Sequence, residues 1–203
     1  MGRLADLATR ALLPSAGVWV VNVLVGRALR RVDETPAVRA LQARRTPTRD
    51  RVAKVVSTTS DVPASVAIAT LSIPALLAVR KPWPVAIMPA LAMGLETWSY
   101  VAAGALVNRE RPAVERLDRD QPTSSFPSGH VGATVALMVV CWRLAADLPV
   151  PARRLVRALC AAYPTALAPS RVYVGMHFPT DVAAGVVNGL ACGALALHWT
   201  KED

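Results

Sequence analysis

The sequence predicts an all-α integral membrane protein, a single domain over residues 1–203 built as a bundle of six transmembrane helices. Hydrophobic residues make up 53% of the 203 residues. They are gathered in blocks whose lengths approach the roughly 20 residues that cross a bilayer, and short polar segments separate these blocks. Because backbone groups in hydrocarbon must be satisfied internally, each block is expected to form a helix.

Six blocks are candidate spans, and the first and fifth are short for a full crossing. In chain order they are Ala11–Val25, Val62–Val79, Pro84–Val107, His130–Leu144, Leu155–Pro169 and Thr180–Trp199. Alternating spans place the loops after the first, third and fifth on one face of the membrane. The loop Arg27–Lys54 carries nine Lys and Arg, and within it a surface helix is predicted around Pro36–Arg44.

Charge and cysteine content exclude several classes of function. The chain has 23 Lys and Arg against 14 Asp and Glu, a net charge of +9. No basic helix is interleaved with aromatic residues, so nucleic acid is not an expected partner. A lipid bilayer and a phosphorylated substrate fit the positive charge better. The three cysteines lie in apolar blocks without metal-ligand spacing and are expected to be core residues.

Three polar clusters interrupt the apolar chain at Asn108–Pro112, at Ser124–His130 and between Ser170 and Asp181. The first two clusters share the loop after the third span, and the third lies after the fifth span. All three are therefore expected on the same face of the bundle, which predicts an active site at one membrane interface.

Several side chains in these clusters suit the binding of a phosphate group. Arg109, Arg111 and Arg171 offer planar donors that match phosphate oxygens. Ser128 is a plausible N-cap of the fourth span, where free backbone N–H groups attract anions. Gly129 has no Cβ to block the close approach of an oxyanion.

Two histidines and one aspartate suit acid–base or nucleophilic chemistry. His130 opens the fourth span, and His177 lies just before Pro179, which suits the first position of a helix. Asp181 then falls in the first turn of that helix, where a carboxylate can orient an imidazole.

At this point the chain resembles the type 2 phosphatidic acid phosphatase family, whose motifs read K-x6-R-P, P-S-G-H and S-R-x5-H-x3-D. The second motif is intact at Pro127–His130, and the third is intact from Ser170 to Asp181. The first is partial, because Arg111-Pro112 match but Gly104 stands where the family has lysine.

The resemblance implies hydrolysis of a phosphomonoester or diphosphate on a membrane lipid, with no metal and no cofactor. Polyprenyl diphosphate, phosphatidic acid and phosphatidylglycerol phosphate are the candidate substrates. His177 would form a phosphohistidine with Asp181 orienting it, and His130 would donate a proton to the leaving oxygen. The phosphate ligands implied are Arg111, Arg171, Ser128, Gly129 and Ser170, and Arg109 would replace part of the lysine missing at Gly104.

Two other functions remain open. A vanadate-dependent haloperoxidase shares these phosphate motifs, although the short chain and six spans disfavour it. A catalytically silent lipid-phosphate-binding protein is favoured only by Gly104. Glu96, inside the third span, is either hydrogen-bonded to a neighbouring helix or an accessory partner of an active-site arginine.

The predicted location is the bacterial cytoplasmic membrane, and the family resemblance places the active face outside the cytoplasm. The distribution of charge opposes this orientation. We count 14 Lys and Arg on the active side and nine on the side of the termini, whereas cytoplasmic loops normally carry the excess.

Overall fold

The computed structural model describes residues 2–119, 121 and 123–200, and the regular elements in these residues are all helical. The N-terminal helix is continuous through α1 (Gly2–Leu7), a π-helical turn (Ala8–Leu12) and α2 (Leu13–Leu29). The others are α3 (Thr35–Gln42), α4 (Pro47–Thr58), α5 (Val62–Ala78), α6 (Trp83–Val107), α7 (Gly129–Leu144) with a 3-10 turn at Ala145–Asp147, α8 (Val150–Tyr173) and α9 (Pro179–Trp199).

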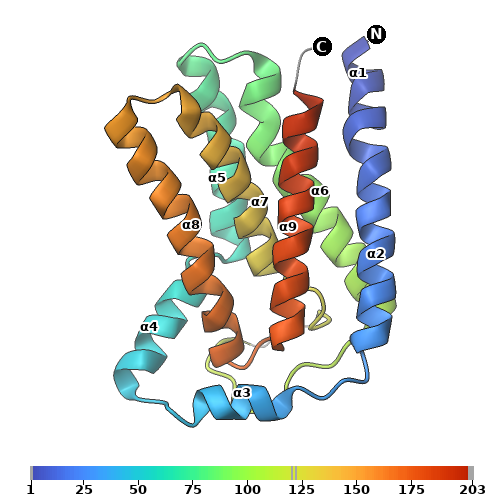
Figure 1. The fold of residues 1–203 in the computed structure, drawn as a ribbon, viewed down its shortest axis with the longest axis vertical. Coiled ribbons are helices and arrows are strands. Elements are labelled where there is room, and N and C mark those ends of the chain that lie inside the picture. The colour runs from blue at the N-terminus through green and yellow to red at the C-terminus, as the bar shows by residue number, and fades with distance from the viewer. Residues whose placement is uncertain (1, 120, 122, 201–203) are drawn as a thin grey trace.

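The long helices stand side by side, and α3 crosses the end of the bundle remote from both termini (Figure 1). Within the described residues, four helices are long and apolar enough to cross a membrane: Ala5–Leu29, Trp83–Val107, Gly129–Asp147 and Pro179–Trp199. Helix α5 is apolar but shorter, and α8 carries three arginines in its first two turns. The all-helical membrane fold is therefore confirmed, whereas spanning by α5 and α8 stays a prediction.

One predicted helix end and one predicted loop were wrong. The fifth helix was expected to end at Pro169, but α8 continues to Tyr173, and Gly175 follows it at a φ of +76°. A left-handed glycine is a common helix stop, so Ser170 and Arg171 lie in the last helical turn. Helix α4 was predicted as loop, although Thr46 caps it by accepting a hydrogen bond from the Arg49 N–H at 3.2 Å.

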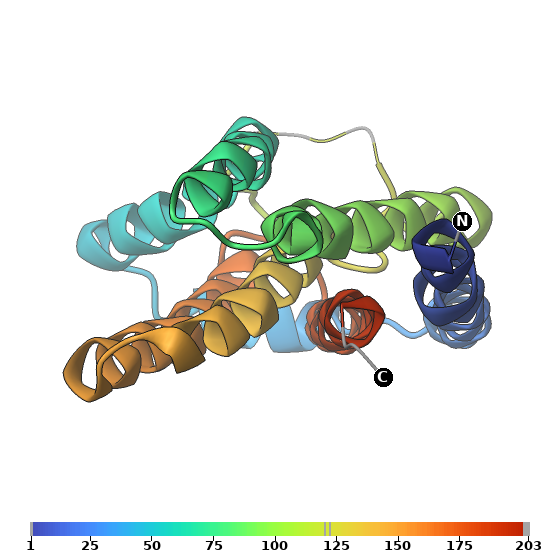
Figure 2. The ribbon, with the colours of Figure 1, turned by 90° about the horizontal axis from the view of Figure 1, so that it is seen from above.

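Helix α9 lies among α2, α6 and α7 (Figure 2), and its contact with α7 depends on small residues. A Cβ added at Gly189 would lie 2.4 Å from the Gly132 carbonyl oxygen, and one at Gly185 would lie 2.5 Å from the Ser128 carbonyl oxygen. Such close backbone approach is typical of helix pairs in membranes. It brings the first turn of α7 directly against α9.

A buried polar network joins α2, α6 and α9. The amide Nδ2 of Asn22 donates to Ser99 Oγ at 3.0 Å and to Asn188 Oδ1 at 2.8 Å. Asn188 Nδ2 donates to Glu96 Oε1 at 3.2 Å. Of the two interpretations of Glu96, the structure supports the hydrogen bond to a neighbouring helix.

The packing predicts that Gly189→Ala destabilises the protein, because the new methyl group would press on the backbone of α7. We expect a loss of about 1–3 kcal/mol, as for other overpacked cores, measured as a lower Tm of the purified protein in detergent. Gly94→Ala is the matched control, since a Cβ at Gly94 meets nothing within 4 Å. Equal Tm values for the two variants would contradict the close contact between α7 and α9.

Candidate active site

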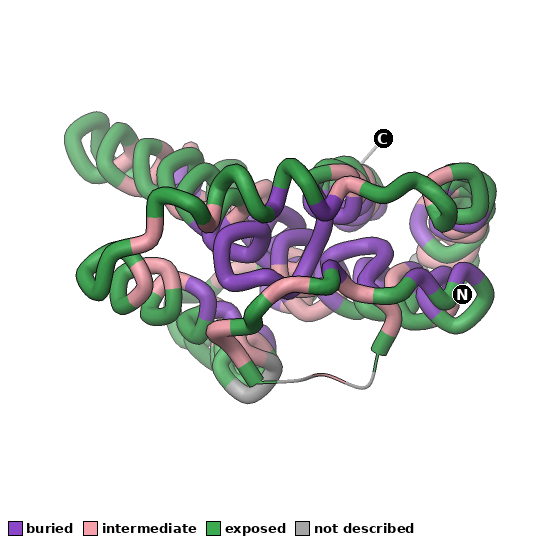
Figure 3. The backbone as a smooth tube through the Cα atoms, turned by 90° about the horizontal axis from the view of Figure 1, so that it is seen from below, coloured by how far each residue is buried: buried purple, intermediate pink, exposed green. Residues whose placement is uncertain are grey.

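The three motifs meet at the end of the bundle that α3 crosses. Seen from that end, the central backbone is buried and exposed segments surround it (Figure 3). The site is built from the loop after α6, the first turns of α7 and α9, and the last turn of α8. The predicted convergence on one face is therefore observed, and each candidate residue can be followed to its contacts.

His177 lies in the turn between α8 and α9 and is 2% exposed. Its Nδ1 is 2.7 Å from the Ser125 carbonyl oxygen. A carbonyl can only accept, so Nδ1 carries the proton and Nε2 is left with its lone pair. Arg171 Nη2 lies 3.5 Å from Nε2. Burial, together with the charges of Arg171 and Arg111, lowers the pKa of His177 well below 6.5, so the ring is neutral at neutral pH.

Asp181 acts on His177 through Ser125. Its Oδ2 accepts from Ser125 Oγ at 2.5 Å and from the Phe178 N–H at 2.9 Å, and its Oδ1 accepts from Arg109 Nη1 at 2.6 Å. The side chain of Ser125 is thus held by Asp181, while its carbonyl holds His177. The sequence predicted that Asp181 orients the imidazole, and in the structure Ser125 lies between them.

Arg109 was predicted to bind phosphate, but both of its Nη atoms are already paired, while its Nε is buried without a hydrogen-bond partner among the described residues. Nη1 pairs with Asp181, and Nη2 donates to Glu34 Oε1 at 3.0 Å and to the Val32 carbonyl at 2.8 Å. The guanidinium also lies 4.3 Å from the centre of the Phe178 ring. Arg109 therefore holds the loop after α6 to the start of α9, and its part in phosphate binding stays a prediction.

Arg171 is fully buried and is supported from two sides. Its Nη1 donates to Ser57 Oγ on α4 at 2.6 Å and to Asp118 Oδ2 at 2.8 Å. Ser57 in turn donates to the same Asp118 oxygen at 2.8 Å. This support leaves Nη2 beside His177, while Nε is buried with no hydrogen-bond partner among the described residues.

Arg111 and Ser128, like Arg171, each have a buried hydrogen-bond donor that lacks a partner among the described residues. Arg111 Nη1 donates to the Met176 carbonyl at 2.6 Å, and burial, followed by repulsion from Arg171, lowers its pKa to about 10, so it stays charged at neutral pH. In the described part of the chain, Arg111 Nε and Ser128 Oγ are buried and unpaired, as is Arg171 Nε. Unpaired buried polar groups are costly, and an oxyanion would satisfy these.

His130 lies in the first turn of α7, and its Nε2 is 3.3 Å from Asp61 Oδ1 at the start of α5. Gly129, beside it, packs on the ring of Tyr100, where a Cβ would lie 3.0 Å from ring carbon atoms. The Ser170 hydroxyl donates to the Leu167 carbonyl of its own helix at 2.7 Å, and its role as a phosphate ligand stays a prediction.

Gly104, at the position of the family lysine, borders a cavity of about 260 Å³. A Cβ there would lie 3.4 Å from the Phe126 carbonyl oxygen and 3.4 Å from Ser124 Cβ, both ordinary contacts. Tyr100 and Thr123 also line this cavity, and Thr123 Oγ1 accepts from Arg111 Nη2 at 3.2 Å. The space therefore adjoins Arg111.

Among the described residues, no group of three or more His, Cys, Asp or Glu side chains is placed to hold a metal ion. The positive charge near His177 comes from Arg111 and Arg171, which both act on the pKa of His177. The site thus resembles an anion cradle built from guanidinium groups, a hydroxyl and a helix N-terminus.

The contact between His177 and the Ser125 carbonyl predicts one tautomer of the ring. We expect ¹⁵N nuclear magnetic resonance of the detergent-solubilised protein, labelled at histidine, to show protonated Nδ1 and bare Nε2 at neutral pH, and the ring to stay neutral as the pH falls through 6.5. The His177→Gln variant identifies the signal. A ring that carries its proton on Nε2, or that titrates near 6.5, would contradict this geometry.

Comparison with known proteins agrees with this geometry. Residues 85–203 match the PAP2 superfamily. A 93-residue stretch is 38% identical to the decaprenylphosphoryl-5-phosphoribose phosphatase of Mycobacterium tuberculosis and covers 44% of this chain and 47% of that protein. A putative undecaprenyl-diphosphatase of Escherichia coli, YbjG, is 29% identical over 117 residues, which are 54% of each chain. The chain spans about half the length of these curated relatives.

Two crystal structures share the fold. The transmembrane PAP2 type phosphatidylglycerolphosphate phosphatase of Bacillus subtilis aligns with a TM-score of 0.78 at 20% identity, over 90% of this chain and 94% of that one. LpxE of Aquifex aeolicus aligns with a TM-score of 0.63 at 24% identity, over 80% and 93%. Since the family match covers more than half of the residues and contains the motifs that carry His130 and His177, this integral membrane protein belongs to the PAP2 superfamily.

Proposed function

We propose that this protein is a metal-independent lipid phosphate phosphatase that works through a phosphohistidine on His177. The observation that carries the proposal is the environment of this ring. Its Nδ1 is tied to the Ser125 carbonyl, and its Nε2 faces Arg171. A neutral imidazole with a free nitrogen beside fixed positive charge is suited to attack a phosphorus atom.

In the first half-reaction, His177 Nε2 forms a bond to phosphorus while the bond from phosphorus to the leaving oxygen breaks. His130, as the imidazolium, gives its proton to that oxygen. In the second half-reaction, neutral His130 takes a proton from water as the water oxygen attacks phosphorus. The N–P bond breaks, and phosphate and free His177 result. Arg111 and Arg171 stabilise the charge on the phosphoryl oxygens.

Asp61 has a positioning role in this scheme. Its carboxylate lies 3.3 Å from His130 Nε2, so it can stabilise the imidazolium that forms when water is deprotonated. The sequence offered no signal for this partner, because Asp61 lies 69 positions from His130. It precedes an apolar helix that contains none of the three motifs.

The proposed substrate is a polyprenyl-linked phosphate or diphosphate, with phosphatidic acid and phosphatidylglycerol phosphate as the competing candidates. The curated relatives support a polyprenyl substrate, because both are named for decaprenyl or undecaprenyl lipids. The structural relative named for phosphatidylglycerol phosphate supports the competitor. We further propose that the active face lies outside the cytoplasm, on the family resemblance alone.

The first test is phosphate release from these lipids by the purified protein in the presence of excess chelator. We expect release from at least one lipid, and we expect His177→Ala to lower the rate by a factor of about 10³ or more, because the nucleophile is lost. His198→Ala is the matched control, since His198 is exposed at the far end of α9.

Four outcomes would contradict the proposal. Near-normal release by His177→Ala would contradict the assignment of His177 as the nucleophile. Activity that is lost with the chelator and restored by magnesium would contradict metal independence. Absence of release from every lipid, with binding retained, would favour the silent lipid-phosphate-binding protein that Gly104 suggested. Bromide oxidation after addition of vanadate would favour a haloperoxidase.

Restoring the family lysine tests the cavity beside Gly104. The Cβ of Gly104→Lys fits at ordinary contact distances, and the cavity of about 260 Å³ can take the stem. We expect KM to fall about tenfold, the effect of one charge-assisted hydrogen bond of ~1.4 kcal/mol. Gly104→Met supplies a similar stem without charge and should leave KM unchanged. A less stable protein with unchanged KM would instead identify Gly104 as a packing contact.

A further inference from the structure

A second hollow lies on the outside of the bundle, away from His177. It is a groove of about 520 Å³ between α4 and α8, with α3 at one end. Its walls are apolar: Val52, Ala53 and Val56 come from α4, and Ala166 and Pro169 come from α8. Val52 is 57% exposed, so the groove leaves apolar side chains of α4 uncovered near the active face.

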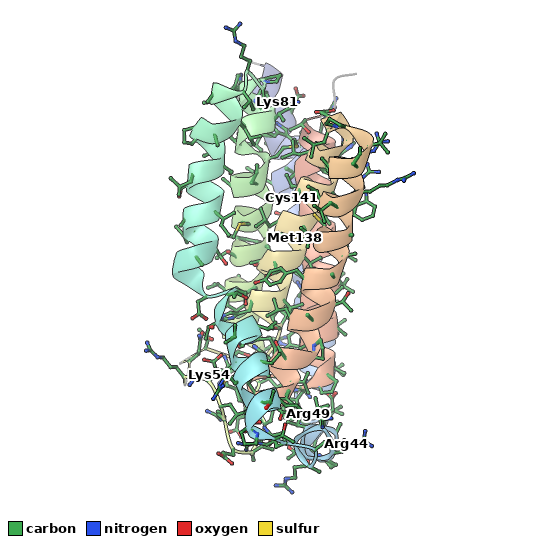
Figure 4. All side chains as sticks on the ribbon, turned by 90° about the vertical axis from the view of Figure 1, so that its left-hand side faces the viewer. Arg44, Arg49, Lys54, Lys81, Met138 and Cys141 are labelled. Atoms are coloured by element: carbon green, nitrogen blue, oxygen red, sulfur yellow. The ribbon has the colours of Figure 1, made fainter. Side chains whose placement is uncertain are left out.

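The charge at this groove is concentrated at one end. Arg44 and Arg49 line it, and both are drawn at the outer end of the bundle, beyond the long helices (Figure 4). Arg49 Nη1 donates to the Arg44 carbonyl at 2.8 Å. The neighbouring carboxylate, Asp50, is already paired with Arg45 at 3.0 Å. Among the described residues, neither Arg44 nor Arg49 forms a salt bridge, and both residues are exposed.

The groove therefore has the polarity of a bilayer lipid, with cations at the water-facing end and an apolar channel toward the bundle. We propose that it binds an anionic phospholipid of the leaflet that borders the active face. The lipid phosphate lies on Arg44 and Arg49, and an acyl chain lies along Val52, Val56 and Ala166. Arginine beside an apolar surface is a typical arrangement for anionic headgroups. This lipid is distinct from the substrate, and its binding is a property in addition to the proposed function.

Residues that line the groove are adjacent to residues that support the phosphate site. Val56 lines the groove, and the next residue of α4, Ser57, accepts the hydrogen bond from Arg171 Nη1 at 2.6 Å. On the opposite wall, Tyr173 donates to Asp50 Oδ1 at 2.6 Å. A lipid that bridges α4 and α8 would hold Ser57 against Arg171. Occupancy of the groove is thus a means of positioning the arginine that faces His177.

The test compares kcat/KM in nanodiscs of phosphatidylcholine with kcat/KM in discs that also contain phosphatidylglycerol. The substrate is a water-soluble phosphate monoester, so that its access does not depend on diffusion in the membrane. We expect the anionic lipid to raise kcat/KM about fivefold, the lower end of the usual coupling between two sites. The double variant Arg44→Gln/Arg49→Gln should lose this increase and keep the activity measured in phosphatidylcholine.

The matched control is Arg51→Gln/Lys54→Gln, which removes the same amount of charge from exposed residues of α4 that do not line the groove. It should keep the full increase. Loss of the increase in both double variants would show a general surface-charge effect and overturn the proposal. Equal increases in both, or an increase with added neutral lipid alone, would overturn it as well.

Direct binding provides a readout that does not depend on catalysis. Native mass spectrometry of the protein released from phosphatidylglycerol discs should show one more retained lipid for the wild type than for Arg44→Gln/Arg49→Gln. Val52→Gln, which adds a polar group to the apolar wall, should also reduce retention. Equal lipid retention by the wild type and the arginine double variant would contradict the site even if the protein hydrolyses no phosphate, so failure here and failure of the proposed function remain distinguishable.

Discussion

The buried ion pair between Arg109 and Asp181 is the interaction on which the rest of the active face depends. Arg109 belongs to the loop after α6, and Asp181 belongs to the first turn of α9. Taking both charges out of water is unfavourable unless each is fully hydrogen-bonded. Glu34 and the Val32 carbonyl accept hydrogen bonds from Arg109 Nη2, and Ser125 Oγ and the Phe178 N–H donate hydrogen bonds to Asp181. Four separate segments are thereby held in one register around His177.

The helical fold and the meeting of the three motifs were largely predictable, because both depend on signals that lie within short stretches of sequence. Apolar blocks predicted the long helices, and motif spacing predicted that His130, His177 and Arg171 meet on one face. Helix α4 was missed because its nearby charges outweighed the start signals Thr46 and Pro47. The extension of α8 was missed because Pro169 was taken as its end, whereas the left-handed Gly175 follows the last turn.

The supporting contacts were not predictable, since they join residues that are remote along the chain. Ser57 reaches Arg171 across 114 positions, and Asn22 reaches Asn188 across 166. Ser125 uses its backbone carbonyl, a group that every residue has and no residue type can reveal. The ion pair of Arg109 with Asp181 was not foreseen, for a related reason. An arginine near a phosphate motif has the same appearance in sequence whether it contacts an anion or a buried carboxylate.

The small residues of α9 also restrict how a lipid reaches the site. Gly185 and Gly189 bring the backbones of α7 and α9 so close that even one added carbon would overlap a carbonyl oxygen. Two helices in such contact leave no gap as wide as a hydrocarbon chain. A tail that slides in from the bilayer must therefore pass on another side of the bundle. The α7–α9 contact is closed at Gly185 and Gly189, so a lipid-linked substrate of the kind proposed would have to enter elsewhere.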